Sequence, residues 1–185
     1  MPYPAQISRT LIVETAWVMI ATQGFDHLSL SELATELGVK APSLYRHVEN
    51  KAELLKAMNE LTMLRMFQHI MAALGQEPAR DQLLRAGLAL WDFAHTHPNQ
   101  YMLALGTVDA FSRPDVTQHQ AHIQQLQTIM GQISGEAHAR TAMRGALSLI
   151  HGFIVLMINQ QLSPNETELQ ADFQQAFGAY LDGWR

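Results

Sequence analysis

Apolar residues recur along this chain at helical spacing, separated by glycines, prolines and capping residues. Ser8 precedes the first such segment and Gly24 follows it, as an N-cap and a C-terminal stop would. No stretch of useful length alternates like a half-buried strand, so the pattern predicts an all-α fold with about nine helices. We expect them over residues 9–23, 29–37, 41–48, 50–74, 79–97, 100–105, from beyond Pro114 to about 133, 137–161, and 166 to the end.

Two short helices in the first third of the chain are joined by a tight turn. Ser29 with Glu32 forms a capping box at the start of the first, and Gly38 ends it in the left-handed conformation that glycine tolerates. Pro42 lies where a first-turn proline is favoured, so the second helix begins near it. This is helix-turn-helix geometry, which presents the second helix to a DNA major groove. The apolar residues expected to form its small core are Leu30, Leu33, Ala34, Leu37, Val39, Leu44 and Val48.

The outward residues of the second short helix are unusual for a merely solvated surface. They comprise Lys40, Ser43, Tyr45, Arg46 and His47. Lys51 lies in the first turn of the next helix, where exposed backbone amides add to its attraction for a phosphate. Each residue alone has an ordinary structural explanation, such as an N-cap for Ser29 or a core aromatic for Tyr45. Their combination at this spacing favours DNA binding.

Composition and charge narrow the possible functions. The chain is 48% hydrophobic and 16% charged, which argues against global disorder. Its net charge is −5, and the first 56 residues carry a net −1, so any DNA contact must come from a local cluster plus backbone amides. The absence of cysteine excludes disulfides and thiolate metal sites. The apolar run 147–158 is shorter than the roughly 20 residues of a membrane span, so we expect a cytoplasmic protein without a membrane partner.

Residues 24–55 resemble the N-terminal DNA-binding region of TetR/AcrR transcriptional regulators. The resemblance is carried by Gly24-Phe25, Ser29, Leu33-Ala34, Leu37-Gly38-Val39, Leu44-Tyr45-Arg46-His47, Lys51 and Leu54-Leu55. It covers about the first third of the chain and is specific, because several spaced residue types agree at once. Val48 stands where the family most often has phenylalanine. Pro42 stands where glycine is common, and it removes a backbone donor.

The resemblance implies which residues touch DNA. On the DNA backbone it places Ser29, Ser43, Tyr45, His47 and Lys51. Against base edges it places Lys40, Ala41, Pro42, Ser43 and Arg46. It also implies a homodimer that represses transcription, with a three-helix DNA-binding domain at 1–55 and a helical ligand-binding and dimerisation domain at 56–185.

Two C-terminal helices carry apolar residues that suit a twofold interface. The helix near 141–161 is apolar around nearly its whole circumference, and the last helix has one apolar stripe. The expected interface residues are Leu147, Ile150, Ile154, Met157, Ile158, Leu169, Phe173, Phe177 and Tyr180. An unusually apolar monomer core is the alternative. Because two half-sites about 34–36 Å apart bind together better than either alone, a dimer predicts a palindromic operator in double-stranded DNA.

The helices between residues 58 and 133 suit a pocket for a small, mostly apolar or aromatic effector, and equally an ordinary core. Residues 93–101 with His151-Gly152 resemble a C-terminal domain type of some of these regulators. The ligand-binding candidates are Leu61, Arg65, Gln68, Trp91, His95, Tyr101, Leu105, Phe111, Met130 and His151. Such a ligand would release DNA by stabilising a dimer whose recognition helices are wrongly spaced.

Two other classes of function remain open. An enzyme is disfavoured because the sequence has no phosphate loop, nucleophile elbow or HExxH motif, and we expect no cofactor. His119 with His122, or His95 with His97, could ligate a metal, but carboxylates at matching spacing are missing, so we expect none. A helical adaptor that has kept the fold without DNA binding is the second alternative, supported by the acidic net charge and Pro42.

Overall fold

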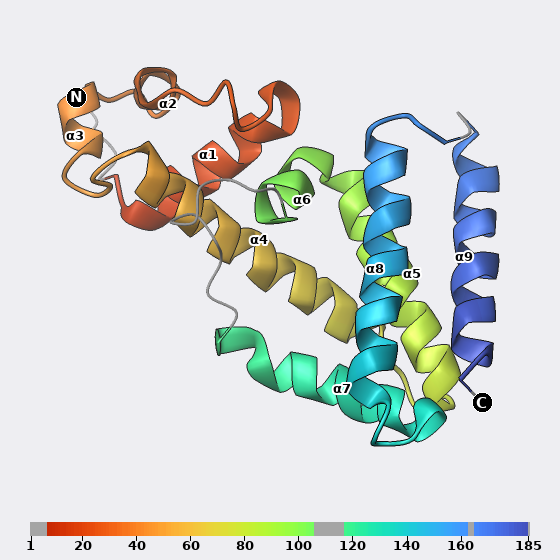
Figure 1. Cartoon of the computed structure of the whole chain (residues 1–185). Coiled ribbons are helices and arrows are strands. Elements are labelled where there is room, and N and C mark those ends of the chain that lie inside the picture. Colours follow the sequence, from red (N-terminus) through yellow and green to blue (C-terminus); the bar gives the residue numbers. More distant parts are fainter. Residues whose placement is uncertain (1–6, 106–116, 163–164, 185) are drawn as a thin grey trace. The chain divides into compact units, whose positions relative to one another are not determined.

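The computed structural model describes residues 7–105, 117–162 and 165–184, and all regular structure in these ranges is helical (Figure 1). The elements are α1 (Arg9–Gln23), α2 (Leu30–Glu36), α3 (Ala41–Leu44), α4 (Lys51–Ala73), α5 (Ala79–Thr96), α6 (Pro98–Leu105), the 3-10 turn η2 (Thr117–His119), α7 (Gln120–Ser134), α8 (Ala139–Ile158) and α9 (Glu166–Asp182). The described ranges thus contain nine α-helices, which confirms the predicted all-α class.

The clearest difference from the expected boundaries concerns α3, which ends at Leu44 instead of near Val48. The chain stays coiled beyond it, because the His47 and Val48 N–H groups both donate to the Leu44 carbonyl, at 2.8 and 3.0 Å. Helix α6 begins earlier than expected, with Pro98 as its first residue. A proline suits that position because a first-turn N–H has no partner within the helix.

The chain divides into two compact units. The described residues 7–64 and 97–105 form the first unit, and residues 65–96, 117–162 and 165–184 form the second. Residues of α4 therefore belong to both units, and α6 returns to the first. The functional boundary expected at residue 55 stays a prediction, because compactness does not say what a unit binds.

The first unit has one core, to which α1, α2, α3, α4 and α6 all contribute. Its fully buried side chains include Ile12, Ile20, Leu33, Leu44, Leu54, Met58 and Leu103. Four of the expected core residues are buried, namely Leu33, Ala34, Leu44 and Val48. The other three, Leu30, Leu37 and Val39, pack against this core while partly exposed.

A buried polar pair joins α1 to α4 within this core. The Trp17 indole N–H donates to Thr62 Oγ1 at 2.9 Å, and the Thr62 hydroxyl donates to the Met58 carbonyl at 2.8 Å. Helix α6 attaches to α1 in a related way. Gln100 Nε2 donates to the Trp17 carbonyl at 2.9 Å, and Asn99 Nδ2 donates to the Ala21 carbonyl at 2.9 Å.

In the second unit, α5 packs against α7, α8 and α9 (Figure 1). Trp91 of α5 stacks on Phe173 of α9 with ring centroids 4.8 Å apart, and Phe173 stacks on Phe177 at 5.8 Å. Arg80, near the start of α5, forms an ion pair with Asp182 at the end of α9. Its Nε and one terminal nitrogen donate to the two Asp182 carboxylate oxygens at 2.7 and 2.8 Å. Aromatic stacking and one bidentate ion pair thus fix α9 on α5.

Helix α8 is long and apolar enough to cross a membrane, judged by length and composition alone. It starts at Ala139, so the whole helix is longer than the apolar run 147–158 considered in the sequence. One such helix is weak evidence for a span, because core helices of soluble proteins meet the same criteria. One side of α8 is buried in the second unit through Ala142, Ala146, Ile150 and Ile154. Its other side is exposed.

Replacing Thr62 by valine should destabilise the protein, because it removes the acceptor of the buried Trp17 N–H. The free energy of unfolding should fall by about 1–3 kcal/mol, the cost of an unsatisfied buried polar group. Urea denaturation followed by circular dichroism measures the change. The control is Thr35→Val, because Thr35 is exposed and its hydroxyl bonds only the Ser31 carbonyl of its own helix. Equal losses in the two variants would show that the Trp17 contact does not stabilise the fold.

Gly87→Ala should also destabilise the protein, because a Cβ at Gly87 would overlap the ring of Phe177, which is 2% exposed. Overpacking of this kind costs about 1–3 kcal/mol. Gly131→Ala is the control, since a Cβ there would meet Ala139 Cβ at an ordinary 3.6 Å. That change should leave the protein unaffected or stabilise it by about 0.4–1 kcal/mol through the unfolded chain. Thermal unfolding of both variants tests the difference, and an equally stable Gly87→Ala protein would contradict it.

Candidate nucleic-acid interface

The turn between α2 and α3 is tight because of one left-handed residue. Gly38 has φ +66°, as the sequence predicted, and the next N–H, of Val39, donates back to the Ala34 carbonyl at 2.9 Å. Leu44 and Val48, 0% and 1% exposed, anchor the other end of α3 in the core of the first unit. The orientation of this short helix is therefore set at both of its ends.

The anchoring leaves the polar residues of α3 and its flanks toward solvent. Lys40, Pro42 and Arg46 are exposed, and Tyr45 is 54% exposed. The half-buried ones are Ala41, Ser43 and His47. Neither Lys40 nor Arg46 makes an ion pair with any residue in the described ranges. Tyr45 is thus not a core aromatic, and both cations are available to a phosphate or a base edge.

Ser29 is an N-cap, and the cap does not use its whole hydrogen-bonding capacity. Its hydroxyl oxygen accepts from the Glu32 N–H at 3.3 Å. The hydroxyl proton remains available, because accepting a hydrogen bond does not consume the O–H donor. Capping and donation to a phosphate are therefore compatible at this residue.

Lys51, the first residue of α4, is held close to the entrance of α2. Its Nζ donates to the Asp26 carbonyl at 3.1 Å, which leaves two further N–H donors. The nearby carboxylate of Glu53 is occupied, because it accepts from Arg9 at 3.3 Å and from the Glu49 backbone N–H. The acidic residue in the first turn of α4 is thus partly neutralised.

The ligand-binding candidates are spread over both units. In the first unit Leu61 is half-buried, Tyr101 is fully buried and Leu105 is 39% exposed. In the second, Trp91 and Met130 are buried, Arg65 and His151 are half-buried, and Gln68 and His95 are exposed. Phe111 lies outside the described residues. Burial raises the pKa of Tyr101 and lowers the pKa of His151, so both side chains are neutral at neutral pH.

Two of these candidates share a cavity. Trp91 and His95 line a space of about 180 Å³ between α5, α8 and α9, together with Asp92, Met157, Thr167, Leu169 and Gln170. Asp92 is paired with His69, whose Nε2 lies 3.0 Å from one carboxylate oxygen. Met157 also belongs to the expected dimer interface, so the cavity includes residues from two predicted sites.

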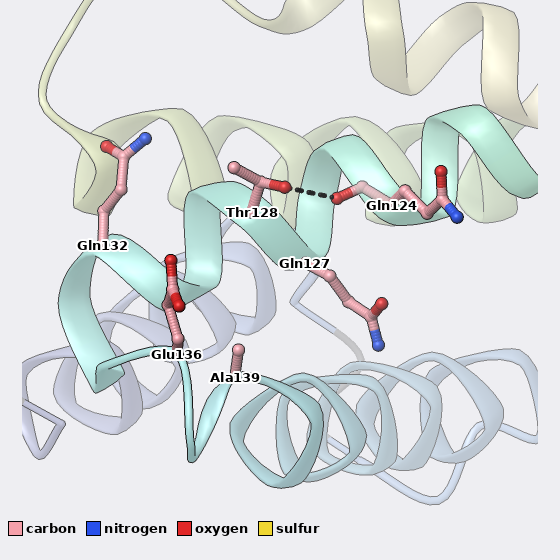
Figure 2. Close-up of a pocket in the computed structure, with 7 residues that line it drawn as sticks. Gln124, Gln127, Thr128, Gln132, Glu136 and Ala139 are labelled. Carbon is pink, nitrogen blue, oxygen red and sulfur yellow. Dashed lines mark hydrogen bonds between the residues drawn. The ribbon is translucent and has the colours of Figure 1, made fainter.

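A larger groove, lined mainly by residues of polar type, was not predicted. It measures about 530 Å³ and runs along α7 and the turn into α8 (Figure 2). Its lining comprises Gln124, Gln127, Thr128, Gly131, Gln132, Glu136 and Ala139. The glutamine-rich composition of this helix was the only sequence signal for it. Its lining lacks the apolar and aromatic side chains expected of the effector pocket.

The expected dimer interface is divided by burial. Five of its nine residues lie inside the second unit of the single chain, namely Ile150, Ile154, Leu169, Phe173 and Phe177. Leu147 is 40% exposed, and Met157, Ile158 and Tyr180 are half-buried. The reason is that α5, with Trp91, covers the side of α9 that carries the apolar stripe, and that α7, α9 and α5 pack against the buried side of α8. The buried five contribute to the fold of one chain and are not available to a second.

The histidine pairs are arranged differently from a metal centre. Within the described ranges no group of three or more His, Asp or Glu side chains could hold a metal ion. His95 and His97 belong to different units, and His97 lies edge-on to Trp17 at 4.9 Å. His119 and His122 lie together against Phe67.

Two family models match the chain. One, described as bacterial regulatory proteins of the tetR family, matches residues 12–58, which contain the helix-turn-helix. The other, described as a tetracyclin repressor-like C-terminal domain, matches residues 83–180.

Curated relatives carry similar descriptions. An uncharacterized HTH-type transcriptional regulator of Mycobacterium tuberculosis is 40% identical over 103 residues, which are 53% of this chain and 45% of that protein. The match thus spans less than half of that relative. The uncharacterized HTH-type transcriptional regulator YobS of Bacillus subtilis is 26% identical over 168 residues, which are 89% of this chain and 86% of YobS.

Solved structures share the fold over nearly the whole chain. A protein with unknown function from Rhodococcus sp. RHA1 has a TM-score of 0.77 at 21% identity, covering 100% of this chain and 98% of that one. A TetR variant from Acinetobacter baumannii AYE, in complex with minocycline, has a TM-score of 0.73 at 18% identity, covering 96% of each chain. The likeness at these identities concerns the fold. Since the two family models together cover the helix-turn-helix and most of the second unit, this chain belongs to the TetR family and is a transcriptional regulator of that family.

Proposed function

We propose that this regulator is a cytoplasmic repressor that binds a palindromic operator as a homodimer and is released by a small, mostly apolar or aromatic ligand. The observation that carries the proposal is α3, a helix anchored by Leu44 and Val48 whose polar residues remain open to solvent. Side chains that serve neither the core nor an ion pair suit recognition of a major groove.

The individual contacts follow from exposure and chemistry. Lys40 and Arg46, with Ser43 between them, are the donors available to base edges, and arginine favours guanine through a bidentate contact. Pro42 offers no backbone N–H and contributes only van der Waals contact. The phosphate contacts fall to Ser29, Tyr45, His47 and Lys51, with Ala41 close to the bases.

The small number of cations makes dimerisation important. Lys40, Arg46 and Lys51 are the basic residues of each half-site, and a half-site that neutralises few phosphates releases few counterions and binds weakly. Two linked half-sites compensate, since the second contact forms at a high effective concentration. Similarity to tetracycline repressor class D of Escherichia coli, 32% identical over 72 residues that are 33% of that protein, supports a repressor.

The exposed side of α8 is the surface that we assign to the dimer. Small residues, Ser148 and Gly152, lie in its middle, and Val155 and Leu156 lie beside them. No atom lies within 4 Å of the position that a Gly152 Cβ would occupy, beyond its own backbone and neighbours. Two helices can approach closely at such a surface, with Leu147 and Ile158 at its edge.

The effector acts by shifting a population. A ligand that prefers a non-binding dimer by a coupling of about 1–3 kcal/mol weakens operator affinity by roughly 5–150-fold. The candidates for its site are the aromatic and apolar residues named above, of which Trp91 and His95 share a cavity.

Selection of random DNA by the purified protein at low salt tests the central proposal. The parent chain should enrich a palindrome, and Tyr45→Ala and Lys51→Ala should not. Because Tyr45 is exposed, Tyr45→Ala should stay within about 0.5 kcal/mol of the parent in unfolding free energy. Lys51→Ala also loses the hydrogen bond to the Asp26 carbonyl and should cost about 0.5–1.5 kcal/mol. For Lys51→Ala the slope of log affinity against log salt should fall by about 1 per protomer.

Lys56→Ala provides the matched control, because Lys56 is an exposed lysine on the same helix, beyond its first turn. It should keep operator binding. A folded dimer that enriches nothing would overturn the repressor proposal. A second selection with cell extract added would then separate a regulator that needs a ligand to bind DNA from a helical adaptor.

Gly152→Arg should dissociate the dimer without unfolding the chain, because the single chain has room for the side chain and a close helix contact does not. Sedimentation equilibrium should show that the dissociation constant of the dimer rises at least tenfold. Ala72→Arg adds the same charge at an exposed position of α4 in the second unit and should leave the dimer intact. An unchanged dimer in Gly152→Arg would place the interface elsewhere.

A further inference from the structure

Three buried ring nitrogens at the start of α7 have no hydrogen-bond partner among the residues that the structure describes. They are Nδ1 and Nε2 of His119 and Nδ1 of His122. His119 is only 2% exposed. Buried polar groups are nearly always paired in native proteins, because an unpaired one loses its bonds to water without replacement. These nitrogens therefore lack a partner among the described residues, and a bound ligand could supply one.

Both imidazoles lie against the ring of Phe67 on α4. The ring centroids of His119 and His122 are 4.8 and 5.7 Å from that of Phe67, with interplanar angles of 18° and 25°. The two imidazoles are 6.1 Å apart. A spacing of three residues places them on one side of the first turn of α7. An aromatic platform thus adjoins two polar rings, all within the second unit.

The protonation of this cluster limits what it can bind. Burial, and next the neighbouring His122, lower the pKa of His119, so its ring is neutral at neutral pH. A neutral imidazole has one N–H donor and one nitrogen acceptor. Neither ring forms an ion pair with a described carboxylate. A matching partner must therefore both accept and donate a hydrogen bond.

We propose that His119 and His122 are the polar anchor of the effector site and bind the hydroxyl of a phenol-type aromatic ligand. The proposal rests on the proposed function, since it names the chemical class of the effector. A phenolic hydroxyl accepts a hydrogen bond from the N–H of one imidazole and donates one to a nitrogen of the second imidazole. Its ring extends the stack formed with Phe67.

A metal ion satisfies the cluster less well. Metal-bound histidines almost always donate their second ring N–H to a carboxylate or carbonyl, and neither His119 nitrogen has such a partner in the described ranges. No third ligand joins the pair in the described ranges. A hydroxyl needs neither a third ligand nor a counter-charge.

The position of the cluster suits a regulatory site. Phe67 is on α4, the helix that begins with the DNA-binding candidate Lys51. The three nitrogens are buried, so a ligand that pairs with them becomes part of the packing around Phe67. Occupancy is thereby tied to the environment of α4.

Phenol is the first probe, and toluene is the control ligand of similar size that lacks the hydroxyl. In a sample labelled with ¹⁵N-histidine, millimolar phenol should shift the ring nitrogen resonances of His119 and His122. Toluene should bind at least tenfold more weakly, because a site built to hydrogen-bond a hydroxyl rejects the analogue without it. Equal binding of the two probes, or no shift with phenol, would overturn the proposal. So would Zn²⁺ binding through these rings in place of phenol.

Variants supply a test that does not depend on the ligand. His119→Phe retains the ring stacking and removes both unpaired nitrogens. His119→Leu also removes the nitrogens, with a smaller side chain that has no ring. At least one should raise the Tm of the ligand-free protein by about 2–4 °C, and both should abolish the phenol response. His138→Leu is the control, since His138 is exposed and its ring lies tilted by 36° against that of Trp184, and it should keep the response. A lower Tm in both His119 variants would show that His119 is a structural residue.

Operator binding by the same variants separates the two proposals. If His119→Phe binds the selected palindrome like the parent and phenol affects neither protein, the ligand assignment fails and the repressor remains. If the parent selects no DNA while phenol binds at His119, the proposed function fails and the ligand site remains.

Discussion

The packing of Leu44 and Val48 into the first unit is the constraint on which the recognition surface depends. Helix α3 has only four residues, and so short a helix has no stability of its own in water. Its conformation is maintained by those two anchors at one end and by the left-handed Gly38 turn at the other. Because both ends are fixed, the Tyr45 and Arg46 side chains point to solvent. The exposed polar surface of this helix is thus a consequence of core packing.

The helix ends could be predicted because their causes lie within one turn of sequence. Ser8, Ser29 and Asn50 accept hydrogen bonds from backbone N–H groups three residues further on, as their spacing indicated. Gly24 and Gly38 take positive φ where a helix stops. Such signals need no knowledge of the tertiary structure, which is why nine helices and the helix-turn-helix followed from the sequence.

The side of α8 that is buried could not be predicted in the same way. Its apolar residues surround the helix, so periodicity could not distinguish Ile150 and Ile154, which are buried, from Leu147 and Leu156, which are exposed. The choice is made by the helices that pack against α8, namely α7, α9 and the more distant α5. Helix α6 illustrates the same limit, because a hydrogen bond from Gln100 to the Trp17 carbonyl, 83 residues away, left no local trace. The division of the interface and ligand candidates therefore required the structure.

Two buried polar groups differ in whether the described residues pair them. In the first unit the Trp17 N–H donates to Thr62 within the chain. In the second unit the ring nitrogens of His119 are as buried but unpaired. A ligand can shift an equilibrium only by its differential interaction with the two states. Groups that are unpaired in the free protein and paired in the complex supply such a difference, so a cost in folding stability becomes the source of the response. Sequence analysis identified this histidine pair as a weak metal candidate, because spacing alone does not show whether a nitrogen is paired.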